Sequence, residues 1–213
     1  AEAPKKTFGI SMFMIDVDRE GLSHQPIEKV GTNTLASSTV FFDNVHVRDD
    51  ELIGEVDQGW RQLLDVLNTE RIVTTAGLVG AGRLAIALGV AYAKERRVFG
   101  GTAIGAYQAM QFPLAQRWAE LEAAKLLNLK AASLFDNGLP FGSESNAAKL
   151  IASQAASAVA EHAMQIMGGM GYSREMHVER LWRDARLFRF APVSEEMILN
   201  YIATANLGLP RSY

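Results

Sequence analysis

Two adjacent arginines near a glycine-containing turn are the clearest candidates for binding chemistry in this sequence. Arg96 and Arg97 come at the end of a long helical pattern, and Phe99 and Gly100 follow them. A guanidinium group binds phosphate through paired, charge-assisted hydrogen bonds, so these arginines could hold a phosphorylated ligand. They could instead only complement the negative end of a helix dipole. The residues by themselves leave both interpretations open.

A second candidate is the group of glycines in the segment QIMGGMGY. Gly168, Gly169 and Gly171 follow a helical pattern, and Gln165 precedes them. Glycine adopts the left-handed conformation at little cost, so the group could end a helix. It could also let a ligand approach the backbone closely. A Rossmann motif is excluded, because that pattern needs a strand before the glycines and a helix after them.

A third candidate is a carboxylate next to an arginine within the long helical pattern. Glu70 and Arg71 stand in the segment LNTER. A carboxylate can act as a base when desolvation raises its pKa. An isolated glutamate on a helix is more simply explained as a solvated residue, since glutamate is a good helix former.

The elements that must position these residues change in type near residue 55. Before that point, short runs rich in β-branched and aromatic residues predict strands at Phe8–Val17, Gln25–Val30 and Ser38–Val47. So few strands cannot form a stable sheet alone, so we expect them to need partners from other sequence. The first residue is Ala1 and the opening residues resemble a loop, so we expect the chain to begin within a longer protein.

After Gly54 the sequence becomes helical. The first helix is expected over Gln58–Arg97, with Asp57 as its N-cap and glycines that could kink it. Four further helices are expected at 107–136, 143–168, 176–187 and 194–206. The predicted fold is α+β and mostly α, with a partial antiparallel β domain at 1–55 and an antiparallel helical bundle at 56–213.

Composition excludes several classes of function. A net charge of −3 argues against a nucleic-acid surface, and the absence of cysteine excludes disulfides and thiolate chemistry. The four histidines show no metal-ligand spacing, so no metal site is expected. No run of about 18 uninterrupted apolar residues predicts a membrane span.

Four stretches together resemble the acyl-CoA dehydrogenase family, in order and over nearly the whole chain. They are FDNVHVRDDELIGEVDQGW, YAKERRVFG, QIMGGMGY and LWRDARLFRFAPVSEEM. The resemblance implies a flavoprotein oxidoreductase of fatty acid metabolism that binds FAD and an acyl-CoA thioester. It covers the end of the family's β domain and its C-terminal helical domain. The residues that it implies for FAD are Arg96, Phe99, Gln108, Gln165, Gly168, Gly169, Ser194 and Glu196.

The family's usual catalytic glutamate has no counterpart in this sequence. Its position falls on Pro192, and Val193 stands where the family has glycine. Proline can neither abstract a proton nor offer a backbone N–H to polarise the thioester carbonyl. Some branches of the family carry the base on the long helix, and the matching residue here is Glu70. Arg71 then matches an arginine on the acyl-CoA side of the site, and Glu195 or Glu196 is an alternative base.

Two other functions stay open on the same fold. One is a flavin-dependent monooxygenase, which does not need the α-proton base, and the other is a non-catalytic partner or scaffold subunit. For the dehydrogenase, the resemblance implies an electron acceptor such as an electron-transferring flavoprotein and a homodimer or homotetramer. We expect the protein in a bacterial cytoplasm rather than in the mitochondrial matrix.

Overall fold

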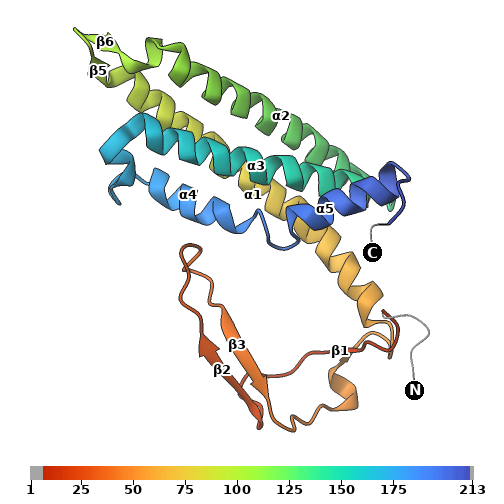
Figure 1. Cartoon of the computed structure of the whole chain (residues 1–213). Helices are drawn as coiled ribbons and strands as arrows, with labels where there is room; N and C mark the ends of the chain where they lie inside the picture. Colours follow the sequence, from red (N-terminus) through yellow and green to blue (C-terminus); the bar gives the residue numbers. More distant parts are fainter. Residues whose placement is uncertain (1–6, 212–213) are drawn as a thin grey trace. The chain divides into compact units, whose positions relative to one another are not determined.

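The computed structural model describes residues 7–211, and helices dominate this range (Figure 1). The α-helices are α1 (Gly59–Glu95), α2 (Gln108–Asp136), α3 (Gly142–Met167), α4 (Val178–Leu187) and α5 (Glu195–Tyr201). The strands are β1 (Met12–Phe13), β2 (Leu22–Pro26), β3 (Ser38–Phe42), β4 (Leu52–Ile53), β5 (Arg97–Val98) and β6 (Thr102–Ala103). Short helical turns are η1 (Asp49–Glu51), η2 (Ile104–Ala106), η3 (Gly168–Tyr172) and η4 (Ile202–Asn206). The predicted fold class is confirmed.

The chain divides into two compact units, one up to Leu67 and one from Asn68 onward, so α1 contributes to both. The domain boundary expected after residue 55 stays a prediction.

The first unit holds two antiparallel strand pairs, β2 with β3 and β1 with β4. The strands predicted from the sequence are longer than those observed. The strand expected over Ser38–Val47 ends at Phe42, because Asn44 adopts a left-handed backbone with a φ of 49° and turns the chain. The strand expected over Phe8–Val17 is reduced to Met12–Phe13, since its partner β4 is only two residues long.

The weaker strand expected over Gln25–Val30 lies instead at Leu22–Pro26, where each residue from Leu22 to Pro26 is paired with β3. No apolar side chain up to Leu67 is buried within the described residues. This agrees with the expectation that these strands need further partners.

The helix α1 is continuous, without the kink that its glycines allowed. It begins at Gly59, so Asp57, which has a φ of 64°, is not its N-cap. Two glycines instead make room for neighbouring helices. A Cβ added at Gly82 would lie 2.7 Å from a methyl group of Leu121 on α2, and one at Gly89 would lie 3.3 Å from the Cβ of Ala163 on α3. These glycines serve helix packing.

The central helix of the second unit is α3, which packs against α2 and against α4 (Figure 1). Its buried face consists largely of alanine, at positions 148, 152, 155, 156, 160 and 163. Small side chains allow neighbouring helices to pack at short interaxial distances. The remaining core comes from larger apolar residues such as Leu121, Val159 and Ile198, each fully buried. The predicted antiparallel bundle thus forms around an alanine-rich helix.

By length and composition α1 could cross a membrane, since its best 18-residue window has a mean hydropathy of 1.6. One third of that window is buried within the protein. Leu78, Val79 and Ala85 of this helix belong to the apolar core. A core helix of a soluble protein passes the same length and composition test, so one such helix is weak evidence for a span.

Candidate active site

A pocket of about 470 Å³ brings together three of the residues predicted to bind a phosphorylated ligand. Arg96 lines it from the end of α1, and Gly168 and Gly169 line it from the end of α3. The other lining residues are Tyr92, Val98, Ile104, Ile166, Met167 and Met170. Residues about 70 positions apart in the sequence therefore meet at one end of the bundle.

The backbone of Arg96 is fixed on both sides while its side chain is exposed. Its N–H donates to the Tyr92 carbonyl at 2.9 Å, and its own carbonyl accepts from the N–H of Ile104 at 2.9 Å. Within residues 7–211 the guanidinium group forms no hydrogen bond or ion pair. A cation held at a pocket wall with its donors unused is suited to binding an anion such as phosphate. Arg96 also follows the C-terminal end of α1, so it complements the helix dipole as well.

The three glycines at the end of α3 differ in what the structure requires at each position. Gly168 has a φ of 59°, which favours glycine, and its N–H donates to the carbonyl of Gln165. Gly171 is buried, and a Cβ there would lie 2.4 Å from the carbonyl oxygen of Met164. At Gly169 the φ is not positive and a Cβ would meet nothing within 4 Å. Within the described residues, neither a positive φ nor close packing therefore requires a glycine at position 169.

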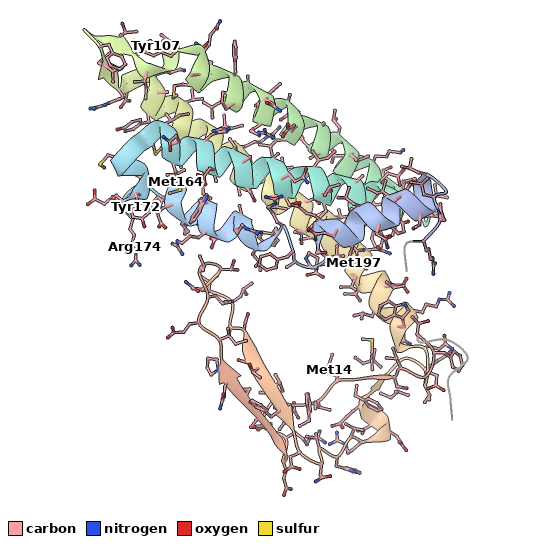
Figure 2. The ribbon with its side chains drawn as sticks, viewed as in Figure 1. Met14, Tyr107, Met164, Tyr172, Arg174 and Met197 are labelled. Carbon is pink, nitrogen blue, oxygen red and sulfur yellow. The ribbon has the colours of Figure 1, made fainter. Side chains whose placement is uncertain are left out.

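The turn that follows Arg96 presents an aromatic ring to solvent. Phe99 is 90% exposed and has a φ of 45°, which is uncommon for a residue with a side chain. Its ring contacts that of Tyr107 edge-to-face, with centroids 6.2 Å apart. Tyr107 lies near the β5–β6 hairpin (Figure 2). Gln108 begins α2 and is also exposed. Phe99, Gln108 and Gln165 do not line the pocket.

Glu70 and Arg71 are adjacent on α1 but differ in environment. Glu70 is exposed, and its carboxylate forms no hydrogen bond or ion pair within the described part of the chain. Arg71 is only 8% exposed, donates to Oδ1 of Asn68, and leaves its Nε without a partner. Burial lowers the pKa of Arg71, and the charge of Glu70 opposes that shift. A buried cation therefore stands beside an exposed carboxylate.

The segment around Pro192 is held by charged groups. Glu195 is buried and accepts two hydrogen bonds from Arg189, at 2.6 and 2.8 Å, and a third from Gln154. The Arg189 hydrogen bonds lower the pKa of Glu195 despite its burial. A base at this position would need a raised pKa, so Glu195 is poorly suited to proton abstraction.

The next helix begins at this segment. Ser194 caps α5, because its Oγ accepts from the N–H of Met197 at 3.4 Å. Glu196 is exposed, and hydrogen bonds from its own N–H and from the Ser194 hydroxyl lower its pKa. This carboxylate also complements the positive end of α5.

The structure adds one residue that the sequence interpretation missed. Lys149 on α3 is fully buried, and its Nζ donates to the carbonyl oxygen of Val193 at 2.7 Å. Burial lowers the pKa of Lys149 to about 8. Helical spacing could have found it, because Lys149 shares a face with Ser145, Ala152 and Ala156, all of which are buried.

Comparisons with known proteins identify relatives that cover most of this chain. Residues 57–207 match the family model described as "Acyl-CoA dehydrogenase, C-terminal domain". FadE12 of Mycobacterium tuberculosis, named an acyl-CoA dehydrogenase, is 43% identical over 205 residues, which are 95% of this chain and 53% of that protein. Subunit CarC of the caffeyl-CoA reductase–Etf complex of Acetobacterium woodii is 38% identical, over 86% of this chain and 48% of that protein.

Among solved structures, a complex of glutaryl-coenzyme A dehydrogenase with glutaryl-CoA has a TM-score of 0.90 and 34% identity. The match covers 97% of this chain and 52% of that one. The chain therefore spans about half the length of the relatives it matches.

Proposed function

The chain belongs to the acyl-CoA dehydrogenase family, and we propose that it supplies FAD contacts and a helix-borne glutamate base for α,β-dehydrogenation of an acyl-CoA thioester. The activity would belong to the complete native protein, since the relatives are about twice as long as this chain. The single observation that carries the proposal is the pocket in which Arg96 meets Gly168 and Gly169.

The pocket fits a dinucleotide phosphate in charge and in shape. The guanidinium of Arg96, which has no partner among residues 7–211, offers donors to phosphate oxygens. Gly169 leaves space where a side chain would otherwise project. Phe99 follows β5 and Gln165 lies near the end of α3, both elements that line the pocket. Gln108 begins α2, and all three residues are proposed as further FAD contacts. Ser194 and Glu196 are proposed contacts at the start of α5. When bound, FAD would supply the acceptor for the hydride that leaves the β carbon of the thioester.

Glu70 is the proposed base for the other half of the reaction. A carboxylate oxygen of Glu70 would take the α proton, while the C–H electron pair goes to the forming double bond. Among the described residues the carboxylate has no ion pair or hydrogen bond that would have to be broken. Covering Glu70 with the acyl chain would remove it from water and make it a stronger base. The neighbouring Arg71 is the proposed contact on the acyl-CoA side, with an unused Nε donor.

The cofactor part of the proposal is tested by a matched pair of arginine variants of the complete native protein. Arg96→Gln should weaken FAD binding by about 10- to 100-fold, because it removes charge-assisted hydrogen bonds. Arg97→Gln, an exposed neighbour in β5, should leave FAD binding within about 3-fold of wild type, as is typical of a surface substitution. FAD affinity is measured by equilibrium dialysis with flavin absorbance. Equal losses in both variants would contradict a specific role for Arg96.

A panel of acyl-CoA thioesters tests the reaction itself. Anaerobic bleaching of the bound flavin by a thioester supports dehydrogenation. Consumption of oxygen by the reduced flavin with incorporation into substrate would support a monooxygenase instead, and a protein that retains no flavin would support a scaffold. None of the observations on this chain favours either of these two alternatives.

The electron acceptor proposed for the complete protein is an electron-transferring flavoprotein. CarC, a relative at 38% identity, is named as a subunit of a reductase–Etf complex. The dimer or tetramer and the bacterial cytoplasmic location stay predictions.

A further inference from the structure

Lys149 is a buried cation with an unusually small set of partners. Its exposed fraction is 0%, and the hydrogen bond to the Val193 carbonyl at 2.7 Å is the one that its ammonium forms within residues 7–211. Removing an ammonium group from water is costly unless strong interactions compensate for the lost hydration. A neutral alanine would fit the alanine-rich face of α3 more simply. The hydrogen bond to the Val193 carbonyl is therefore the interaction that distinguishes Lys149 from an alanine at this position.

That carbonyl belongs to the turn between α4 and α5, which we call the 192–194 turn (Pro192, Val193 and Ser194). Pro192 has no N–H, so the turn cannot be held there by a backbone donor. Ser194 at its end is fixed by α5, whose Met197 N–H donates to the Ser194 Oγ at 3.4 Å, and just beyond the turn the Glu195 N–H donates to the Arg189 carbonyl at 3.2 Å. Lys149 thus supplies the hydrogen bond from α3 that fixes the middle of the turn.

The charged groups that face Lys149 come from two other helices. Glu195 and Glu196 of α5 favour its charged form, whereas Arg71 of α1 disfavours it. Burial is the largest influence, and the pKa near 8 leaves the lysine mainly protonated at neutral pH. The charge of Lys149 is therefore influenced by Arg71, a proposed substrate contact, and by α5, which follows the turn.

We propose that Lys149 is a positioning residue, which holds the 192–194 turn in the geometry needed for the reaction through its hydrogen bond to Val193. This inference rests on the proposed function, since Ser194 at the end of the turn is one of the proposed flavin contacts. Lys149 itself is not proposed to touch substrate or cofactor.

The test compares Lys149→Met with Lys130→Met in the complete native protein. Methionine keeps the length and apolar stem of lysine but removes the donor. Lys130 is an exposed lysine on α2, paired with Glu144 at 2.9 Å, and serves as the matched control. The readouts are FAD content, kcat and KM with a thioester that bleaches the wild-type flavin, and amide hydrogen exchange of residues 193–198 by mass spectrometry.

Lys149→Met should lower kcat by about 10- to 100-fold, because small misplacements of a site cost rates of that order. FAD content and KM should change by less than about 3-fold, since the proposed contacts with cofactor and substrate remain. Exchange of the 193–198 amides should speed up in Lys149→Met and stay unchanged in Lys130→Met. In wild type, kcat should also fall as pH rises through about 8, where Lys149 loses its proton, and Lys149→Met should lack this pH dependence.

Wild-type kcat together with wild-type exchange in Lys149→Met would overturn the proposal. If that variant does not fold, Lys149→Gln, which retains polarity but is too short to reach Val193, takes its place with the same expectations, and wild-type kcat per bound FAD overturns it equally. Failure of every thioester to bleach the wild-type flavin would instead contradict the proposed function. Faster exchange in the variant would still support the positioning role in that case.

Discussion

The two units of this chain differ in how many apolar side chains they bury. From Asn68 onward, the helices bury fully covered side chains such as Leu121, Val159 and Ile198. Up to Leu67, no apolar side chain is buried in the described residues, and the aromatic rings of Phe41 and Phe42 are 48% and 66% exposed. Hairpins that leave their apolar faces uncovered are marginal in water. Within residues 7–211, the helical unit therefore contains the buried apolar core, and the strand pairs contribute no side chain to it.

The largest expected effect comes from breaking the helical core. Leu121→Ala should lower the free energy of unfolding by about 2–5 kcal/mol, because it leaves a cavity against Gly82. Phe42→Ala in the first unit should lower it by less than about 1 kcal/mol, because that ring is already largely exposed. Hydrogen exchange of α3 amides in the 213-residue chain measures both. A larger loss for Phe42→Ala would show that the strands, and not the helices, form the principal core.

A smaller effect separates structural from ligand-facing glycines within the helical unit. Gly171→Ala should destabilise the protein by about 1–3 kcal/mol, since its Cβ would clash with the Met164 carbonyl. Gly169→Ala should change stability by less than about 0.5 kcal/mol, because its Cβ would project into open space, yet it should weaken FAD binding. Thermal unfolding of the apoprotein and flavin dialysis provide the two measurements. Unchanged FAD affinity in Gly169→Ala would contradict the proposed pocket.

The smallest effect concerns one buried charge in each unit, Glu51 and Lys149. Arg19 hydrogen-bonds to Glu51 and lowers its pKa below the ordinary 4.5. The stability that Glu51 contributes is therefore present above pH 4.5 and is lost as pH falls through the lower folded pKa. Lys149 has a folded pKa of about 8 and an ordinary one of 10.5, so between these values the unfolded chain binds more protons. Stability due to Lys149 therefore rises with pH across that window.

The two pH windows are measured by urea unfolding at a series of pH values. The difference between wild type and Glu51→Gln should change only in acid, and the difference between wild type and Lys149→Met only above about pH 8. If the free energies of unfolding of wild type and Lys149→Met change in parallel from pH 7 to 10.5, burial does not shift the pKa of this lysine.

The same contrast explains what the sequence could predict. Helices such as α2 and α3 were predicted to within a residue or two, because their pattern and end signals, including Gly138 with a φ of 67°, are local. Strand lengths were wrong, since they depend on partners elsewhere in the chain. Family resemblance predicted separate FAD contacts for Arg96 and Gly168, but neither it nor any local pattern predicted that the two residues line one pocket. Lys149 was missed because a lysine in an alanine-rich helix normally points to solvent.

The most direct test of the proposed function is the rate at which an acyl-CoA thioester bleaches the flavin of a Glu70→Gln variant. The measurement is made anaerobically on the complete native protein, with Glu95→Gln, an exposed glutamate at the end of the same helix, as the control. Glu70→Gln should slow bleaching by about 100- to 10,000-fold while FAD content stays at the wild-type level, because it removes the proposed base. Glu95→Gln should bleach like wild type. Bleaching of Glu70→Gln at a rate near that of wild type would contradict the assignment of the base to α1.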